Sequence, residues 1–466
     1  MLRLFNSLGR EMQEFRPIRD GEVRIYNCGP TVWNYAHVGN FRAFVFYDVL
    51  RRHLKFKGYK VTSVMNITDV EDKIIRAVGQ TGKSLRELTE FYIAAFMEDL
   101  ASLKIEKMEA MPRATEHLPE ILRLVRTLVE KGYAYRTADG SVYFDVSKFK
   151  RYGALSGVRL DSLRPAGRVS SDHYEEKKEA ADFALWKAWE PGDGDVFWES
   201  EFGRGRPGWS VECSAMSMNY LGETFDIHTG GADLKFPHHE NEIAQSEAAT
   251  GKKFVNYWLH SEFLNVSGRE MHKSSGNLVT LRELLTLGWD PLTVRAFLVS
   301  GRYRDQVDLT EAALSQAKAQ RGRLQELLAR LRGVKGGTGE VPGAVGEFLA
   351  GFEAAMDDDL DTPRALAAML TFTKEANAMI DSGEIGGAGA QAAMHALARA
   401  DSVLGILKFG EDDLEPELAE LVREREAARQ RRDFAESDRL RAELLAAGVV
   451  VEDTPEGTRW KRVRGG

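Results

Sequence analysis

The sequence predicts an α/β protein with a doubly wound parallel sheet, an α+β insertion, a following helical bundle and a small C-terminal α+β unit. Three observations predict it. Branched and aromatic residues dominate 23–26 and 60–66, and each run leads through a polar turn into a helical pattern. The same order of strand, glycines and helix resumes only at 225–245. From residue 309 onward the helical period dominates.

The first predicted strand leads into a turn, Cys28 to Asn40, and a helix follows over 41–57. The first N–H groups of a helix lack partners and its dipole is positive there, so such a turn attracts phosphate. Gly39 lets a ligand come close to the backbone, between the imidazole of His37 and the amide of Asn40. The turn therefore predicts a phosphate site, although four residues of this kind also occur together by chance.

An acidic group, Asp69, Glu71 and Asp72, follows the second predicted strand. Carboxylates in this position suit metal ligands. The alternative, which we favour from the residues alone, is a solvated loop at the end of a strand.

The segment 108–206 differs in character from its surroundings. Before it, Ser84 and Glu87 form a capping box that opens a long helix. Within it, Asp139-Gly140 signals a hairpin between two short strands. Because strand-and-glycine chemistry resumes directly afterwards, we expect this segment to interrupt the sheet domain rather than to follow it.

The rest of the chain reads as a strand region, a loop and helices. The strand region is 254–266, the loop is 267–277, and Thr280 with Glu283 caps the next helix. The remaining predicted elements are a linker at 333–346, helices over 347–407 broken at 383–389, a junction at 411–415, one charged helix over 418–447 and an extended tail over 449–462.

Composition excludes several classes of protein. No run approaches the ~20 apolar residues of a membrane span, and the N-terminus is too short and too polar for a signal peptide. Two cysteines in 466 residues do not form a disulfide framework, so we expect a reducing, cytoplasmic setting. The net charge of −8 argues against indiscriminate binding of nucleic acid but permits a local basic patch.

One group of residues combines the only two thiols of the chain with an imidazole and a carboxylate: Cys28, Cys213, His238 and Glu242. The last two lie four residues apart in a predicted helix and project from one face. All four are zinc ligands by type, and four complete a tetrahedral site. The alternative is two buried cysteines and a surface pair. His239 competes for the imidazole position, but the residue four further on is Ile243, which binds no metal.

Two basic stretches complete the candidate sites. Lys273 lies in a Ser/Gly-rich loop, from which a lysine can close on a bound phosphate; the alternative is a solvated loop. Near the C-terminus, Trp460 is surrounded by arginines and a lysine. An unpaired RNA base stacks on such a ring, although a solvated basic end is the alternative.

Together these motifs resemble the class I aminoacyl-tRNA synthetases and, within them, the cysteinyl-tRNA synthetases. His37-Val38-Gly39-Asn40 is similar to the class signature "HIGH", and Met271-His272-Lys273-Ser274 to the second signature "KMSKS". The zinc set matches the cysteine-specific members. Further similar stretches extend over essentially the whole chain: 28–32, 207–209, 212–216, 236–245, 358–365 and 452–460.

The resemblance implies a Rossmann-like catalytic sheet and a cysteine–tRNA ligase activity. L-cysteine would react with ATP to give cysteinyl-adenylate and pyrophosphate, and the cysteine would then pass to the 3′ end of tRNA(Cys). One zinc ion would select the substrate thiolate over the hydroxyl of serine, so that no editing pocket is needed. Mg²⁺ would accompany ATP, and we expect a monomer.

The resemblance also assigns roles to residues. The catalytic residues implied are His37, Asn40 and Lys273. The ATP-binding residues implied are His37, Gly39, Asn40, Met271, Lys273 and Ser274. The substrate-binding residues implied are Gly29, Thr31, Trp209, His228 and Asp233. The tRNA-binding residues implied are Arg459, Trp460, Lys461 and Arg462. Glu270 and His272 depart from the second signature, and this less basic loop is expected to grip pyrophosphate more weakly.

We expect six regions along the chain. They are the first half of the catalytic domain at 1–107, a connective insertion at 108–206, the second half of the catalytic domain with the zinc ligands at 207–266, a signature-loop and stem-contact region at 267–308, a helical tRNA-binding bundle at 309–410 and a C-terminal anticodon-reading unit at 411–466.

Two alternatives compete with this interpretation. The cysteine ligases of the mycothiol pathway resemble the same fold but join cysteine to an amino sugar, and they are not expected to carry the C-terminal tail. A non-enzymatic, zinc-stabilised RNA-binding protein would carry degenerate ATP motifs, and the two departures in the second signature favour it slightly. Cysteine-dependent exchange between ATP and pyrophosphate separates the enzymes from the RNA-binding protein.

Overall fold

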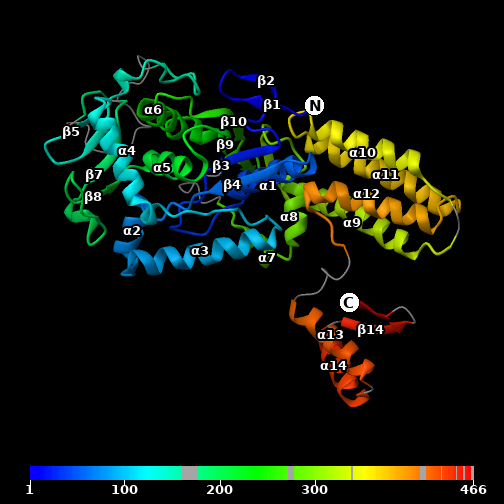
Figure 1. Ribbon diagram of the computed structural model, residues 1–466. Helices are drawn as coiled ribbons and strands as arrows, with labels where there is room; N and C mark the ends of the chain where they lie inside the picture. The colour runs from blue at the N-terminus through cyan, green and yellow to red at the C-terminus, as the bar shows by residue number, and fades with distance from the viewer. Residues whose placement is uncertain are drawn as a thin grey trace. The chain divides into compact units, whose positions relative to one another are not determined.

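The chain folds as two units, Met1–Ile406 and Leu407–Gly466, in a computed structural model (Figure 1). The structure describes residues 1–159, 177–179, 181–270, 278–336, 339–409, 416–431, 433–447, 449–454 and 457–462. The expected junction at 411–415 lies outside the described residues.

Among the described residues, a four-stranded parallel sheet of order β10-β9-β3-β4 is the centre of the larger unit. Its strands are β3 (Glu22–Asn27), β4 (Lys60–Met65), β9 (Phe225–Gly231) and β10 (Val255–Ser261). The chain passes from β3 outward to β4 on one side and from β9 outward to β10 on the other. The predicted doubly wound sheet is therefore confirmed, and its strand order reverses between β3 and β9, where such sheets bind ligands.

Helices connect and cover these strands. They are α1 (Val38–Phe56), α2 (Asp72–Thr81), α3 (Leu85–Ser102), α5 (Trp209–Leu221) and α6 (His238–Thr250). The predicted capping box of α3 is present, because Ser84 Oγ accepts from the N–H of Glu87 while the Glu87 carboxylate accepts from the N–H of Ser84. Local side-chain chemistry thus determines where this helix begins.

The insertion is a separate antiparallel sheet of order β5-β6-β7-β8 beside one long helix. Its elements are α4 (Leu118–Glu130), β5 (Ala134–Arg136), β6 (Val142–Phe144), β7 (Phe183–Ala188) and β8 (Gly205–Pro207), with 3-10 turns at Ala114–Glu116, Val146–Lys148 and Pro191–Asp193. The predicted hairpin joins β5 to β6, and Gly140 there has a φ of +96°. Val211 of α5 and Ala244 of α6 belong to the same hydrophobic core as the insertion.

The acidic group after β4 has structural partners. Asp69 accepts hydrogen bonds from the N–H and hydroxyl of Thr115, at 3.0 and 2.5 Å. Glu71 is the N-cap of α2, and Asp72 pairs with Lys187 and Arg206 of the insertion. These carboxylates therefore hold the insertion and α2 in place, rather than forming a solvated loop.

Two smaller sheets flank the parallel sheet. The hairpin of β1 (Arg3–Asn6) and β2 (Glu11–Glu14) was not predicted. The predicted strand region at 254–266 forms two strands that belong to different sheets. The first is β10, in the parallel sheet. The second is β11 (Leu264–Val266), which pairs with β12 (Arg269–Glu270) and β13 (Val307–Leu309).

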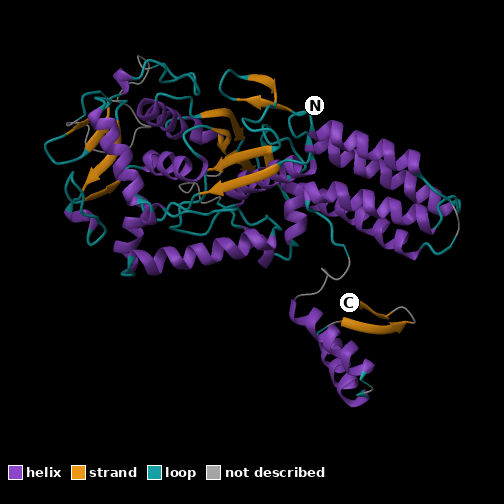
Figure 2. Ribbon diagram, in the orientation of Figure 1, coloured by secondary structure: helices purple, strands orange, loops and turns teal. Residues whose placement is uncertain are grey.

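A helical bundle follows, drawn in purple in Figure 2. Its elements are α8 (Pro291–Leu298), α9 (Glu311–Gly333), α10 (Pro342–Met356), α11 (Thr362–Asp381) and α12 (Gly387–Leu404). The short helix α7 (Leu281–Thr286) precedes it and contacts α3 through Arg282 and Glu98. The predicted apolar stripe of α9 is buried at Leu324, Leu327, Leu328 and Leu331. The linker is shorter than predicted, because α10 begins at Pro342, and proline is favoured in a first turn where its missing N–H is not needed.

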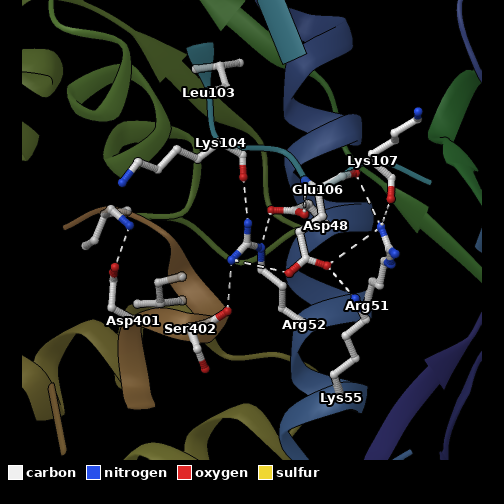
Figure 3. A network of polar contacts seen from close by, with 12 residues as sticks. Asp48, Arg51, Arg52, Lys55, Leu103, Lys104, Glu106, Lys107, Asp401 and Ser402 are labelled. Atoms are coloured by element: carbon white, nitrogen blue, oxygen red, sulfur yellow. Dashed lines mark hydrogen bonds and ion pairs between the residues drawn. The ribbon is translucent and has the colours of Figure 1, made fainter. Parts of the chain in front are cut away.

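Polar contacts fix α1 to the bundle and to the segment after α3 (Figure 3). The Asp48 carboxylate accepts from Arg295 Nη2 at 2.5 Å and from Arg52 Nε at 2.7 Å. The two guanidinium groups also donate to four backbone carbonyls, those of Leu103, Lys104, Ser402 and Leu404. We call Asp48, Arg52, Arg295 and these carbonyls the ionic network.

The smaller unit contains α13 (Pro416–Gln430), α14 (Phe434–Ala446) and a hairpin of β14 (Val449–Thr454) with β15 (Gly457–Arg462). The single charged helix predicted over 418–447 is therefore two helices. The chain restarts at Asp433, whose side chain accepts from the N–H of Glu436 at 3.2 Å as the N-cap of α14.

None of the helices in the described ranges combines the length and the apolar character needed to cross a membrane.

Candidate active site and metal centre

The candidate site lies at the carboxyl ends of β3 and β9, where the strand order of the sheet reverses. The N–H of Cys28 donates to the carbonyl of Thr229 at 3.1 Å, which joins the ends of the two strands. Gly29 packs directly on the end of β4, because a Cβ on Gly29 would lie 1.7 Å from the carbonyl oxygen of Asn66. Only glycine therefore fits at this position of the turn.

Four side chains that are distant in sequence meet beside this turn. Ligand atoms of Cys28, Cys213, His238 and Glu242 all lie within 4.8 Å of one another, and all four residues are buried. They come from the turn after β3, from α5 and from the first two turns of α6. We call this group the metal cluster.

A second set overlaps the metal cluster, with His228 and His239 in place of Cys213 and His238. His239 Nε2 lies 3.2 Å from Cys28 Sγ, and His228 Nε2 lies 2.9 Å from Glu242 Oε2. The sequence argument against His239 looked for a partner within α6. The structure provides Cys28 from the turn after β3 and, three residues along α6, Glu242, whose Oε1 lies 3.9 Å from His239 Nε2. A spacing of four residues was therefore the wrong criterion for this residue.

Buried contacts orient both competing imidazoles. His238 Nδ1 lies 3.1 Å from the Ser210 hydroxyl and its Nε2 lies 3.2 Å from Glu242 Oε1. His239 Nδ1 lies 2.8 Å from His260 Nε2, and His260 in turn contacts Ser7. Sequence reasoning did not find Ser210 or His260, because neither lies at ligand spacing from the thiols.

The two thiols differ in their tendency to ionise. A hydrogen bond from Cys28 lowers the pKa of Cys213 to about 6, against the effect of burial. Burial raises the pKa of Cys28 well above its usual value. Burial tends to lower the pKa of His238, but the charges of Cys213 and Glu242 outweigh it and raise this pKa. The cluster therefore holds negative charge close to an imidazole.

The donors of the metal cluster fit a zinc ion. In the described part of the chain, the ion pairs of Glu242 are with histidines, not with lysine or arginine. A buried carboxylate beside two thiols needs positive charge, because uncompensated buried charge is strongly unfavourable. Two sulfurs, an imidazole nitrogen and a carboxylate oxygen form a tetrahedral set that zinc prefers.

The predicted phosphate turn begins α1. His37 is the N-cap, and it forms a reciprocal cap with Asn40, whose N–H donates to His37 Nδ1 at 3.3 Å. Asn40 Oδ1 accepts from the N–H of His37 at 3.1 Å. Gly39 lies between them in the first turn. The imidazole and the amide thus lie where the backbone N–H groups of the helix begin.

The segment after the lysine loop is tied to the same turn. The N–H of Val38 donates to the carbonyl of Val279 at 2.8 Å, and His37 forms a β-bridge with Thr280. The loop residues predicted to bind ATP, namely Met271, Lys273 and Ser274, lie outside the described residues.

The predicted substrate residues surround the metal cluster at different depths. Thr31 forms a β-bridge with Thr68 at the end of the sheet. Trp209 begins α5, and its ring centroid lies 4.1 Å from that of His238 while 42% of the residue stays exposed. His228 is fully buried and contacts Glu242, and Asp233 is exposed in the 3-10 turn Ala232–Lys235. Trp209 and Asp233 are therefore accessible to a ligand, whereas His228 is buried and inaccessible.

The predicted tRNA residues all lie in β15. In the register of the hairpin, Arg459 is opposite Glu452 and Trp460 is opposite Val451. Lys461 and Arg462 continue the strand opposite Val450 and Val449.

Comparison with known families gives three matches along the chain. A family described as the tRNA synthetases class I (C) catalytic domain matches residues 14–319. The DALR domain family matches residues 351–408, and the family described as the cysteinyl-tRNA ligase anticodon binding domain matches residues 411–460.

Individual proteins are similar over almost the whole chain. The cysteine–tRNA ligase of Protochlamydia amoebophila is 43% identical over 99% of this chain and 98% of its own length. The cysteine–tRNA ligase of Thioalkalivibrio sulfidiphilus is 46% identical, over 99% of this chain and 100% of its own.

Solved structures share the fold at lower identity. A methionyl-tRNA synthetase of Mycobacterium tuberculosis in complex with methionyl-adenylate has a TM-score of 0.62 at 15% identity, covering 89% of this chain and 96% of its own. The catalytic-domain match spans more than half of the chain, and the relatives above cover nearly all of it. The chain therefore belongs to the cysteine–tRNA ligase family of the class I tRNA synthetases.

Proposed function

We propose that this chain activates L-cysteine with ATP and transfers the cysteinyl group to tRNA(Cys). One observation carries the proposal. The metal cluster and the turn of His37 and Asn40 are both reached from the segment that follows the carboxyl end of β3. A thiol-selecting group and a phosphate-binding turn therefore flank one reaction centre.

In the first step, the carboxylate of cysteine attacks the α-phosphate of ATP. The new bond joins the carboxylate oxygen to phosphorus, and pyrophosphate leaves with its electron pair. The nucleophile is already ionised at neutral pH, so no general base is required, and the protein contributes position and charge stabilisation. His37 and Asn40 would hold the phosphates at the start of α1, and Mg²⁺ would accompany the nucleotide.

We assign the metal cluster to one zinc ion, held by Cys28, Cys213, His238 and Glu242. When bound, zinc supplies a Lewis acid that favours the thiolate of the substrate over a hydroxyl. Trp209 would form a wall beside the cluster, and the exposed carboxylate of Asp233 would receive the substrate ammonium. Gly29 and Thr31 would shape the floor of the pocket at the ends of β3 and β4.

His238 is the better candidate than His239 for the imidazole ligand. The set that contains His238 includes both thiols, whereas the set that contains His239 includes only Cys28. The Ser210 hydroxyl lies at His238 Nδ1, which leaves Nε2 directed at the Glu242 carboxylate. A partner at the second ring nitrogen is the usual arrangement for a zinc-bound histidine.

Lys273 is assigned to the α-phosphate, with Met271 and Ser274 beside it. The tie between the starts of α1 and α7 would bring the loop before α7 to the nucleotide. Glu270 in place of a lysine makes the loop less basic, so closure over pyrophosphate would depend more strongly on Lys273.

For the second step, we assign the bundle at 309–410 and the unit at 411–466 to tRNA binding, with Arg459, Trp460, Lys461 and Arg462 reading the anticodon. All four proposed zinc ligands come from one chain, so a monomer is sufficient. Both cysteines are free, which suits a reducing compartment such as the cytoplasm.

The proposal is tested by two assays on one preparation. Wild-type protein should exchange pyrophosphate into ATP only when cysteine is present, and it should charge tRNA(Cys). Exchange without charging, but with transfer to an amino sugar, would favour the mycothiol-type ligase. The absence of cysteine-dependent exchange would refute the enzyme and favour the RNA-binding alternative.

Three variants test the residue assignments. Lys273→Ala should lower the exchange rate by about 100-fold or more and change cysteine binding little, because the lysine acts on the transferring phosphate. His238→Ala should lose bound zinc and discrimination against serine, whereas His239→Ala should retain zinc. The reverse result would assign the ligand position to His239.

A further inference from the structure

An aromatic cluster with large exposed faces lies beside the catalytic turn. Tyr35 precedes His37 by two residues, and Phe91 and Tyr92 lie in α3. Tyr35 is 37% exposed and Phe91 is 49% exposed. We call Tyr35, Phe91 and Tyr92 the aromatic patch. Neither the metal cluster nor the phosphate turn makes use of it.

The rings of the aromatic patch support one another. Tyr35 and Tyr92 pack edge to face, with centroids 5.4 Å apart and planes at 87°, and Phe91 and Tyr92 do the same at 5.1 Å and 82°. Tyr92 is half-buried and packs on a core of Val32, Ile67 and Ile93. The exposed rings of Tyr35 and Phe91 therefore pack on Tyr92, which in turn packs on the core.

Two cations lie over rings of the aromatic patch. Lys83 Nζ lies 5.3 Å from the centroid of the Phe91 ring, and the guanidinium carbon of Arg282 lies 5.1 Å from that of Tyr35. Arg282 is held in place by Glu98 and Asp99 of α3. Aromatic faces next to cations are the combination that binds unpaired nucleotides, because bases stack while phosphates meet positive charge.

The position of the aromatic patch connects it with the reaction centre. Arg282 is in α7, whose start is tied to the start of α1 by the bridge between His37 and Thr280. Figure 1 shows α7 next to the end of α3, and the contact of Arg282 with Glu98 joins these helices. The aromatic patch is therefore part of the rim from which a ligand would reach His37.

We propose that the aromatic patch is a stacking site for the unpaired 3′-terminal nucleotides of the acceptor tRNA. The inference rests on the proposed function, because tRNA charging must bring a terminal ribose to the centre beside His37 and Asn40. The bases next to that ribose have open π-faces, and their phosphates complement Lys83, whereas Arg282 is already paired with Glu98 and Asp99. Stacking on Phe91 and Tyr35 would hold the strand while its last hydroxyl attacks the adenylate.

The test measures binding of tRNA(Cys) and of the same tRNA without its unpaired 3′ nucleotides. Phe91→Ala and Tyr35→Ala should each weaken binding of the intact tRNA by about tenfold and change binding of the shortened tRNA by less than about twofold. Phe91→Trp keeps an aromatic face and should retain wild-type affinity. Tyr220→Ala removes an aromatic side chain of α5 that is 44% exposed and lies outside the patch, so it should change neither affinity.

A second readout uses the charge beside the rings. Lys83→Gln should reduce the salt dependence of binding by about 0.7 in the logarithmic slope for intact tRNA, but not for shortened tRNA. Equal weakening of both RNAs by Phe91→Ala would place the patch against another part of the tRNA and overturn the proposal. Unchanged affinity for both RNAs would also overturn it and point to a protein partner. Failure of the wild type to charge tRNA(Cys) would instead refute the proposed function.

Discussion

The metal cluster and the ionic network are both buried polar groups in the larger unit, and they are completed in different ways. In the ionic network, Asp48 and Arg295 are fully buried and oppositely charged, and the spare donors of Arg295 reach backbone carbonyls. In the metal cluster, two thiols and a carboxylate meet around imidazoles. The first group contains its own cations, whereas we propose that the second binds an added one.

This difference separates scaffold from function. A buried ion pair with all its hydrogen bonds made contributes to a unique packing of α1 against the bundle, and loss of one partner is strongly destabilising. A buried set of metal donors contributes a binding site whose stability depends on the ligand. The two groups should therefore respond differently to the loss of a charged partner and to the loss of a bound ion.

Arg295→Met should lower the free energy of unfolding of the Met1–Ile406 unit by about 3–5 kcal/mol, because Asp48 keeps a buried charge without its principal partner. Urea unfolding measures this. The control is Arg126→Met, which removes a pairing with Glu201 in which the two side chains are 52% and 38% exposed; it should lower the free energy of unfolding by about 1 kcal/mol or less. Equal losses would show that burial does not distinguish the ionic network.

The reference sample contains free zinc at about a hundred times its dissociation constant. Removal of this zinc with a chelator should lower the free energy of unfolding by about 3 kcal/mol. The Cys213→Ser variant should show no such difference between treated and untreated samples. The effect of Arg295→Met should be the same with and without zinc, because distant sites add. A zinc-dependent effect of Arg295→Met would mean that the two groups are coupled.

Gly405→Ala should lower stability by about 2 kcal/mol. Gly405 ends α12 with a φ of +66°, and a Cβ there would lie 2.9 Å from Arg295 Nη2. Gly383→Ala is the control, because Gly383 has a φ of +71° and nothing within 4 Å of the added atom. The Gly383→Ala variant should lower the free energy of unfolding by about 1 kcal/mol through backbone strain alone. A larger loss for Gly383→Ala would contradict a role for Arg295 in the difference.

The smallest expected effect is at the C-terminal end of α1. Burial tends to raise the pKa of Asp357, but hydrogen bonds from His53 and Lys57 outweigh it and lower this pKa to about 2. Because the folded pKa lies below the unfolded value of about 3.9, this stabilisation is full above pH ~4 and is lost as the pH falls through ~2. Asp357→Asn should remove about 1 kcal/mol of this acid-dependent stability, after screening by solvent. Unfolding measured from pH 6 to pH 2 would show unchanged curves if the pair contributes nothing.

Elements set by local chemistry were predictable from the sequence. Capping boxes at Ser84 and Thr280 marked the starts of α3 and α7, and both are present. The break between α13 and α14 was missed although Asp433, with Glu436 three residues later, carries the same kind of signal. The charged residues on both sides of Asp433 fit one continuous helical pattern, so its role as an N-cap was not recognised.

Contacts through space were less predictable. The four members of the metal cluster were named from residue types and a family resemblance, whereas spacing alone favoured two buried cysteines and a surface pair. His239 was set aside because Ile243 lies four residues further on, and its contact with Cys28, 211 residues away, could not be read from the sequence. Asp48 and Arg295 are 247 residues apart, and a charged residue in a helical pattern reads as solvated. Nothing in either local sequence indicates that the two are fully buried.

The reciprocal cap at the start of α1 decides where the ring of His37 carries its hydrogen. Nδ1 accepts the N–H of Asn40, so this nitrogen has no hydrogen of its own. Burial lowers the pKa of the ring, which keeps it neutral at physiological pH. The single ring hydrogen is therefore on Nε2, and this tautomer can only donate there. A phosphate oxygen, which only accepts, is the partner that such a nitrogen selects.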